Sequence, residues 1–346
     1  MSNHSLGFAV YVSTFQQQRQ FLEKLKFRNI RIFTSLHISE ELNETYVQEV
    51  EEMCEWLDEN GFWVMADVSP LTLTRFNEEN LSSLITRLNL DNVRLDFGFD
   101  LSKVKLDGIP YGVTYNASTI LKEGPLNSDA FYMHNFYPRP ETGLDEGFFL
   151  SLNERIQVLS AKTMAFIAGD KQKRGPLHEG LPTLESHRSL APYAQFVDLI
   201  KKYKIDTVFL GDVTLSDYEL DLIMDYLNDQ IIRLPIMFSE INKNLYNQLY
   251  TVRVDSPSNL IRVQESRQYA QQGQEVEPHH MVKRVRGSVT MDNKNYKRYS
   301  GEIQITKADY PQDERVNTIG KLNQKYHLLL NSLYNGEKFM FVPAAQ

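Results

Sequence analysis

One segment of fifteen residues, 174–188, concentrates residue types that can do chemistry. It reads RGPLHEGLPTLESHR and holds two arginines, two histidines, two glutamates, two glycines and two prolines. A polar loop of this length in a compact domain is usually functional or disordered, and its prolines and leucines favour an ordered one. Arg174 and Arg188 can supply the planar, charge-assisted hydrogen bonds that phosphate favours. The segment therefore predicts a phosphate site.

Carboxylates stand at the ends of apolar runs elsewhere in the chain. Asp67, Asp96 and Asp212 each come at or just after the end of such a run. Because an unpaired carboxylate is costly to bury, packing explains these positions poorly. Either the three aspartates take part in the chemistry, or they cap loops and pair with Arg94 or Arg31.

A second polar cluster, HNFYPR at 134–139, ends another apolar run. Amides beside aromatic rings suit sugar recognition, since a ring can stack on the sugar face while its polar edge stays wet. We assign Phe136 to packing and Tyr137 to a ligand.

The sequence predicts neither a metal nor a cofactor. Cys54 is the one cysteine, so a disulfide within the chain and a thiolate metal cluster are excluded. Its helical spacing with Val50 and Leu57 predicts a buried core residue. The eight histidines form no HExxH motif, and no carboxylate run has calcium-loop spacing. His134 meeting Asp67 and Asp212 around a cation is the weaker alternative.

The elements that must position these residues are read from hydrophobic patterning. Eight apolar runs alternate with helical patterns at 7–12, 29–36, 62–69, 92–98, 109–116, 129–137, 162–169 and 206–213. Such runs are typical of parallel strands covered on both faces. They predict an α/β fold, a (β/α)8 TIM barrel, with reactive groups at the carboxyl ends of its strands. A doubly wound sheet would need a glycine-rich loop after its first strand, and VYVSTFQQQRQ contains no glycine.

The pattern changes near residue 250. Short runs separated by turn signals predict strands at 251–255, 259–265, 286–292, 301–307, 316–322 and 338–343. Closely spaced strands of this kind are typical of a small, mostly antiparallel β-barrel. We therefore predict two domains, residues 1–240 and 250–346.

Charge and hydropathy limit the partners. The net charge of −8 gives no support to nucleic-acid binding. Residues 251–346 carry 14 Lys and Arg against 10 Asp and Glu, a mildly basic domain that could attract an anionic substrate. The chain shows no basic, apolar leader and no run of about 18–20 apolar residues. We expect a cytoplasmic protein with no membrane partner.

These segments together resemble the bacterial 6-phospho-N-acetylmuramidase family, formerly a domain of unknown function, some members of which were labelled outer surface proteins. The first domain matches through FTSLHI (33–38), DVSP (67–70), RLDFG (94–98), NAST (116–119), HNFYPR (134–139), TGL (142–144), RGP and EGLPTLE-HR (174–188) and GD (211–212). The second matches through RGS-T-DN--Y-RY-GE-QI (286–305). The resemblance covers nearly the whole chain.

This resemblance implies a TIM barrel fused to a cyclophilin-like β-barrel. It also implies cleavage of the β-1,4 bond in 6-phospho-N-acetylmuramyl-N-acetylglucosamine, a phosphorylated amino-sugar disaccharide of peptidoglycan recycling. Such a disaccharide enters the cell as its phosphate through a sugar phosphotransferase system, which agrees with a cytoplasmic enzyme.

Glycoside hydrolysis usually needs an acid for the leaving oxygen and a carboxylate at the anomeric carbon. We predict Glu185 as the acid, on a loop where partial burial would raise its pKa. Asp96 is the expected partner, ahead of Asp212 and Asp67. The substrate's own 2-acetamido group could instead act as nucleophile, and the sequence leaves that route open.

Other residues are expected to hold the substrate. Arg174 and Arg188 are assigned to the 6-phosphate, with Arg139 as the alternative, and His134, Asn135 and Asn116 to ring hydroxyls or the lactyl carboxylate. The remaining expected contacts are Ser35, Asp67 and Tyr137 and, if the second domain closes over the barrel mouth, Arg286 and Asn293. A second domain that only supports stability or dimerisation is the alternative, so a homodimer stays open.

Rival functions fit the residues less well. Another 6-phosphosugar enzyme, such as a Schiff-base aldolase, would need a lysine near a strand end, and the expected strands offer only Lys162 at the start of one. A phosphosugar-binding protein without catalysis would bind and show no turnover. Prolyl isomerisation by the second domain rests on fold analogy alone.

Overall fold

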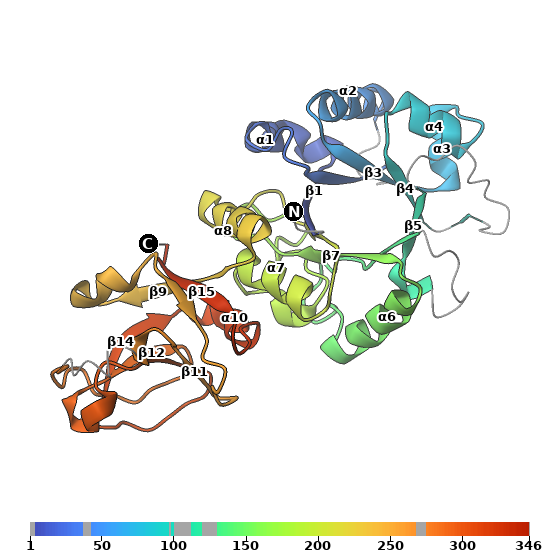
Figure 1. The fold of residues 1–346 in the computed structure, drawn as a ribbon. Helices are drawn as coiled ribbons and strands as arrows, with labels where there is room; N and C mark the ends of the chain where they lie inside the picture. Colours follow the sequence, from blue (N-terminus) through green and yellow to red (C-terminus); the bar gives the residue numbers. More distant parts are fainter. Residues whose placement is uncertain are drawn as a thin grey trace. The chain divides into compact units, whose positions relative to one another are not determined.

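The computed structural model describes residues 4–36, 43–96, 98–99, 112–119, 130–267 and 275–345. The chain forms two compact units, which are described separately (Figure 1). The barrel unit comprises Ser2–Pro192 and Leu199–Ser216, and the second unit comprises Tyr193–Asp198 and Asp217–Gln346. No helix among the described residues is long and apolar enough to cross a membrane.

The barrel unit is built on eight parallel strands that close on themselves, which confirms the predicted TIM barrel. The strands are β1 (Ser5–Ala9), β2 (Arg31–Ser35), β3 (Trp63–Val68), β4 (Asn92–Leu95), β5 (Val113–Asn116), β6 (Phe131–Met133), β7 (Lys162–Ile167) and β8 (Thr207–Leu210). Each overlaps one of the eight expected apolar runs. Residues 97, 109–111 and 129 of those runs lie outside the described residues.

Helices separate most of the strands along the chain. They are α1 (Val12–Glu23), α2 (Tyr46–Glu59), α3 (Pro70–Phe76), α4 (Leu81–Arg87), η2 (Ala117–Thr119), α6 (Glu146–Val158), η3 (Glu185–His187), α7 (Pro192–Lys201) and α8 (Asp217–Asp229). Cys54 is buried on the apolar face of α2 with Val50 and Leu57, as its spacing predicts. Burial raises the pKa of its thiol to about 12, so this cysteine stays protonated.

Aromatic and methionine side chains fill the barrel interior. The buried cluster comprises Ala9, Tyr11, Phe33, Met65, Met133, Met164, Phe166 and Phe209. The rings of Phe33, Phe166 and Phe209 lie with centroids 5.5–6.2 Å apart, as packed aromatic rings do. This layer forms a floor, above which polar side chains from the carboxyl ends of the strands can meet a ligand.

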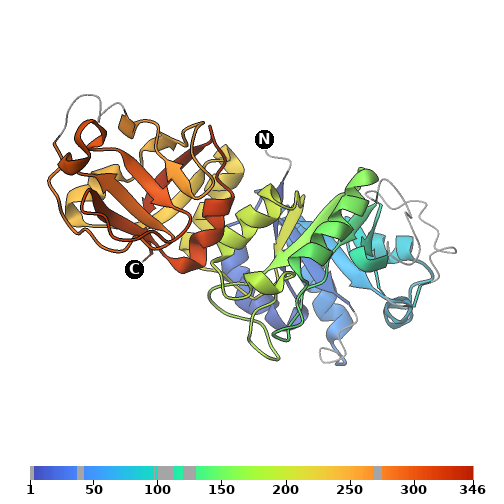
Figure 2. The ribbon, with the colours of Figure 1, turned by 90° about the horizontal axis from the view of Figure 1, so that it is seen from below.

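The second unit is a curled sheet of seven strands (Figure 2). Its strand order is β10 (Leu249–Thr251), β15 (Lys338–Pro343), β9 (Ile232–Phe238), β14 (Val316–Leu322), β12 (Ser288–Asp292), β13 (Ile303–Thr306) and β11 (Leu260–Arg262). All neighbours are antiparallel except β15 and β9. A bridge between Val252 and Val263 joins the two edge strands, so the curled sheet comes back on itself.

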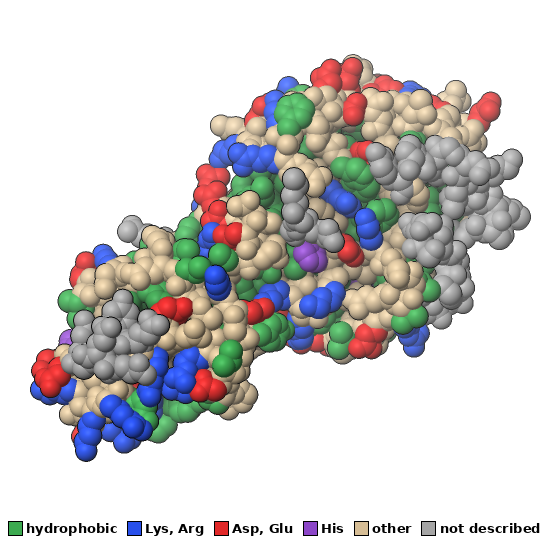
Figure 3. Space-filling view, in the orientation of Figure 1, with side chains coloured by type: hydrophobic (Ala, Val, Ile, Leu, Met, Phe, Trp, Pro, Cys, Tyr) green, Lys and Arg blue, Asp and Glu red, His purple; other side chains and the backbone are tan. Residues whose placement is uncertain are grey.

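Strand β9 is the strand that the sequence did not predict. It falls within residues 1–240, yet it pairs with β14 and β15 of the second sheet. Helix α8 belongs to the same unit, since Glu219 accepts hydrogen bonds from the backbone of Tyr193 (2.8 Å) and from the hydroxyl of Tyr326. The remaining elements of this unit are η4 (Glu240–Leu245), η5 (Lys294–Tyr299), η6 (Gln324–Tyr326) and α10 (His327–Asn331). Lysine and arginine side chains gather on part of its visible face (Figure 3), and residues 251–346 of this unit carry 14 Lys and Arg against 10 Asp and Glu.

Gly7 of β1 is closely packed, which predicts that a side chain added at this position destabilises the fold. A Cβ at this position would lie 2.4 Å from the Phe209 ring and 2.9 Å from the Arg31 carbonyl oxygen. We expect Gly7→Ala to lower the free energy of unfolding by about 1–3 kcal/mol, because the interior cannot accept another methyl group. Urea denaturation followed by circular dichroism measures it.

Gly147→Ala is the matched control. A Cβ added here in α6 would have no described atom of another segment within 4 Å. Alanine is the better helix former by about 0.5–1 kcal/mol, so this variant should be neutral or more stable. Equal stability of the two variants would contradict the packing argument.

Candidate active site

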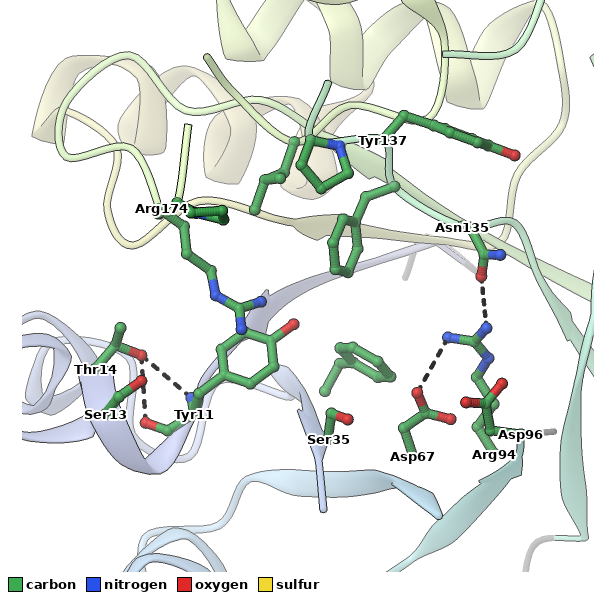
Figure 4. Close-up of a pocket in the computed structure, with 16 residues that line it drawn as sticks. Tyr11, Ser13, Thr14, Ser35, Asp67, Arg94, Asp96, Asn135, Tyr137 and Arg174 are labelled. Carbon is green, nitrogen blue, oxygen red and sulfur yellow. Dashed lines mark hydrogen bonds and ion pairs between the residues drawn. The ribbon is translucent and has the colours of Figure 1, made fainter. Parts of the chain in front are cut away.

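A cavity of about 690 Å³ opens at the carboxyl ends of the barrel strands (Figure 4). All of the described residues that line it belong to the barrel unit. Both charged and aromatic side chains take part, and the lining comprises Tyr11, Ser13, Thr14, Phe33, Ser35, Asp67, Arg94, Asp96, Asn135, Phe136, Tyr137, Pro138, Arg174, Gly175, Pro176 and Leu181. The expected residues Ser35, Asp67, Asp96, Asn135, Tyr137 and Arg174 are therefore brought together here.

Strand register places one polar row across three neighbouring strands. Ser35 of β2 stands opposite Asp67 of β3, which stands opposite Arg94 of β4. The Arg94 guanidinium lies with Nη1 3.6 Å from Asp67 Oδ2, and Nη2 donates to Asn135 Oδ1 at 2.5 Å. Both charged residues are 6 % exposed, so the ion pair lies inside the barrel mouth. Arg94, expected from the sequence only as a partner for an aspartate, is thus also a cavity residue.

Arg174 forms the other charged wall of the cavity. Its guanidinium carbon lies 3.3 Å from the centroid of the Tyr11 ring, a stacked cation–π contact. Tyr11 is the N-cap of α1, so Ser13 and Thr14 of the first helical turn line the same wall. The Arg174 side chain donates no hydrogen bond to another described residue. Its N–H groups can therefore serve an anionic ligand.

Asp212 holds the loops beside this wall and does not line the cavity. Its carboxylate accepts the backbone N–H groups of Gly169 (2.8 Å) and Arg174 (3.0 Å). Burial raises the pKa of this group, and the backbone hydrogen bonds oppose that rise. Asp212 thus joins the loops after β7 and β8 and fixes the backbone from which Arg174 projects.

Glu185 and Arg188 bind each other outside the cavity lining. Arg188 Nε and Nη2 donate to the two carboxylate oxygens of Glu185 at 2.6 Å each, and the N–H of Gly143 donates to Oε2 at 2.8 Å. The Arg188 hydrogen bonds lower the pKa of Glu185 to about 2. An acid working near neutral pH needs the opposite shift. These contacts favour a structural role over the expected proton donor.

Arg188 also holds backbone groups of two loops. Its Nη1 donates to the Gly180 carbonyl at 2.9 Å, and its Nη2 donates to the Tyr137 carbonyl at 3.0 Å. Its guanidinium N–H groups are thus already hydrogen-bonded within the protein, which argues against the expected contact with phosphate. Arg139, the alternative cation, is exposed and does not line the cavity.

His134 faces away from the cavity, and Asn116 is not among the residues that line it. His134 Nε2 lies 2.7 Å from Asn153 Oδ1, its ring packs on Phe149, and burial lowers the pKa of the imidazole to about 4. Because successive residues of an extended chain point to opposite faces, Asn135 enters the cavity while His134 joins the surrounding core. Asn116 Oδ1 accepts from the Ser118 backbone at 3.0 Å and caps the turn after β5.

The two candidates in the second unit make contacts within that unit. Arg286 donates to the carbonyls of Lys307 and His327 and to Asn331. Asn293 is fully buried and donates to the Glu314 carbonyl at 3.0 Å. Among the described residues, no three His, Cys, Asp or Glu side chains are grouped to hold a metal ion, so the weaker cation alternative has no support there.

The Glu185–Arg188 pair makes a pH-dependent prediction. A carboxylate whose folded pKa is about 2, below its unfolded value, stabilises the fold above the unfolded pKa and loses this effect as the pH falls towards 2. We expect Glu185→Gln to lower the free energy of unfolding by about 1–2 kcal/mol at neutral pH. The difference from wild type should shrink below about pH 4.3.

Denaturation series between pH 7 and 3 measure this difference, with exposed Glu154→Gln on α6 as the control. A Glu185→Gln variant with unchanged stability and abolished turnover would instead restore Glu185 as the proton donor.

Comparison with known proteins supports one family for both units. A conserved Enterococcus faecalis protein of unknown function, solved by crystallography, is 30% identical, with 98% of this chain and 96% of that chain covered and a TM-score of 0.81. An uncharacterized B. cereus protein is 26% identical, with 99% and 100% covered and a TM-score of 0.78. No curated protein matches the chain.

The family models match almost the full length. The N-terminal domain of 6-phospho-N-acetylmuramidase matches residues 6–225, and its C-terminal domain matches residues 232–342. The chain, with its TIM barrel and carboxylate-lined cavity, therefore belongs to the 6-phospho-N-acetylmuramidase family of glycosidases.

Proposed function

We propose that this protein hydrolyses the β-1,4 bond of 6-phospho-N-acetylmuramyl-N-acetylglucosamine in the cytoplasm, as a step of peptidoglycan recycling. The observation that carries the proposal is the barrel-mouth cavity of a family member, which combines two carboxylates, Asp67 and Asp96, with the available cation of Arg174. Carboxylates serve glycosidic cleavage, and a guanidinium serves a phosphate group. A phosphorylated sugar arises inside the cell, which supports the cytoplasmic location.

The two carboxylates have different surroundings, and we assign them different roles. The Asp67 carboxylate lies beside the Arg94 guanidinium, which stabilises its negative charge. We assign it to the oxocarbenium-like transition state, either directly or by orienting the 2-acetamido group. Asp96 is half-buried after β4, and we assign it the transfer of a proton to the leaving oxygen.

Binding of the rest of the substrate follows from the lining. We assign the 6-phosphate to Arg174, where the first turn of α1 lines the same wall. Ser35 and Tyr137 remain proposed contacts for sugar hydroxyls, since both line the cavity. For the second unit we propose the cyclophilin-like fold and a supporting role, including a homodimer contact.

The substrate assignment predicts that the enzyme recognises the 6-phosphate of the disaccharide. Wild-type protein incubated with the disaccharide and its unphosphorylated twin should cleave only the phosphorylated compound, as followed by mass spectrometry. Arg174→Ala should lower kcat/KM for that compound roughly tenfold to hundredfold, because a charge-assisted contact is lost.

Arg155→Ala, at an exposed position of α6, should match wild type. Binding of the phosphorylated disaccharide without turnover would replace hydrolysis with a sugar-binding function. Equal cleavage of both compounds would remove the phosphate from the proposal.

The carboxylate roles predict a leaving-group effect. Asp67→Asn and Asp96→Asn should each lower kcat on the disaccharide by about 10²–10⁴-fold. On a nitrophenyl glycoside, whose leaving group needs little protonation, Asp96→Asn should recover most of its activity and Asp67→Asn should not.

Steady-state kinetics with both substrates measure this, and Asp58→Asn on the exposed face of α2 is the control. Recovery by Asp67→Asn instead would exchange the two roles.

A further inference from the structure

The amide of Asn135 can present only one of its two ends to the cavity. Its Oδ1 accepts the 2.5 Å hydrogen bond from Arg94 Nη2. Arginine has donors and no acceptor, so the reversed amide would set two donors against each other. The Nδ2 group is therefore the end turned away from Arg94, on a residue that lines the cavity, and none of the described residues accepts a hydrogen bond from it.

The position of this donor is set from both sides. The Asn135 carbonyl accepts a hydrogen bond from Thr183 Oγ1 at 2.9 Å, and that hydroxyl accepts from the backbone of Phe166 on β7 at 2.9 Å. Thr183 is completely buried, and Arg94 is 6 % exposed. A donor held in this way loses little conformational freedom when a ligand binds, which favours selective recognition.

Charge divides the cavity into two ends. Asp67 and Asp96 lie beside Arg94 at the end that holds Asn135, whereas Arg174 lies over Tyr11 on the other side (Figure 4). With Asp96 protonated for its proposed role, the Asp67 carboxylate and the Arg94 guanidinium offset each other at the Asn135 end. A phosphate or carboxylate of the ligand is therefore attracted to Arg174, and a neutral polar group suits the Asn135 end.

A neutral acetamido group matches the Asn135 end in each of its parts. Its carbonyl is an acceptor only, and Nδ2 is a donor only. Its N–H can donate to a carboxylate of this end, and its methyl group needs an apolar surface. Phe33 supplies that surface, since its ring lines the cavity and its centroid lies 6.0 Å from the Arg94 guanidinium carbon.

We propose that Asn135 is a specificity-determining residue, which selects sugars carrying a 2-acetamido group by donating a hydrogen bond from Nδ2 to the acetamido carbonyl. Arg94 acts as its positioning residue. This inference rests on the proposed function and specifies which group of the substrate lies at which end of the cavity.

Isothermal titration calorimetry with two ligands that differ only in the neutral substituent at C2 tests the contact. The ligands are N-acetylmuramic acid 6-phosphate and its 2-hydroxy analogue, 3-O-lactylglucose 6-phosphate, so both carry the same two anions. The ratio of their dissociation constants isolates the acetamido group. We expect the wild type to prefer the acetamido ligand, and Asn135→Asp and Asn135→Ala each to reduce that preference roughly three- to tenfold, the share of one hydrogen bond.

The two variants control for each other. Asn135→Asp keeps an acceptor for Arg94 and adds a charge, which affects both ligands alike and cancels in the ratio, whereas Asn135→Ala adds none. Arg174→Lys should weaken both ligands equally and leave the ratio at its wild-type value.

An unchanged ratio in both Asn135 variants overturns the inference while the proposed function stands. A wild type that neither binds nor cleaves phosphorylated ligands overturns the proposed function and this inference with it. If neither variant folds, the 2-thioacetamido ligand tests the wild type directly. Sulfur is a weaker acceptor, so equal affinity for the acetamido and thioacetamido ligands overturns the inference.

Discussion

A guanidinium that projects into a closed barrel loses contact with water, so its charge must be neutralised by nearby protein groups. Arg94 meets this constraint through neighbours on or just after two other strands. Asp67 is brought opposite it by the register of β3 and β4, and Asn135 reaches it from the end of β6. The same contacts fix a carboxylate and an amide at the mouth of the barrel. The architecture that neutralises one buried charge thus also builds the polar end of the cavity.

Other charged residues of the barrel mouth hold loops in place. Asp212 fixes the backbone of Arg174, and the Glu185–Arg188 pair joins the segment after β7 to the carbonyl groups after β6. Because the loop carboxylates and guanidinium are taken up by these bonds, Arg174 keeps its own donors for a ligand. Structural and ligand-binding charges lie close together here and differ in whether the protein has already satisfied them.

The resulting cavity is polar in two different ways. One end offers the two carboxylates of Asp67 and Asp96 beside Arg94 and the amide of Asn135, and the other offers a cation stacked on an aromatic ring. A substrate with a neutral amide at one carbon and a phosphate at another can satisfy both ends in only one orientation. Such complementarity gives specificity through the cost of the wrong arrangement.

The sequence by itself determined the eight-stranded barrel, because strand patterning is local and each apolar run needs only its own residues to be recognised. It also placed Asp67, Asp96 and Asn135 at strand ends, where barrel topology brings them to one face. Strand β9 was not predicted, because its residues follow directly on a helix of the β/α pattern while its partners β14 and β15 lie far along the chain.

Only the tertiary structure decided which charges face the cavity. Glu185, Arg188 and His134 have suitable side chains, but other protein groups already bind them. Glu185 accepts from Arg188, and Arg188 also donates to the carbonyl of Tyr137. His134 is hydrogen-bonded to Asn153. Whether a side chain is free to react depends on neighbours that folding brings from distant segments, and residue type and spacing do not contain that information.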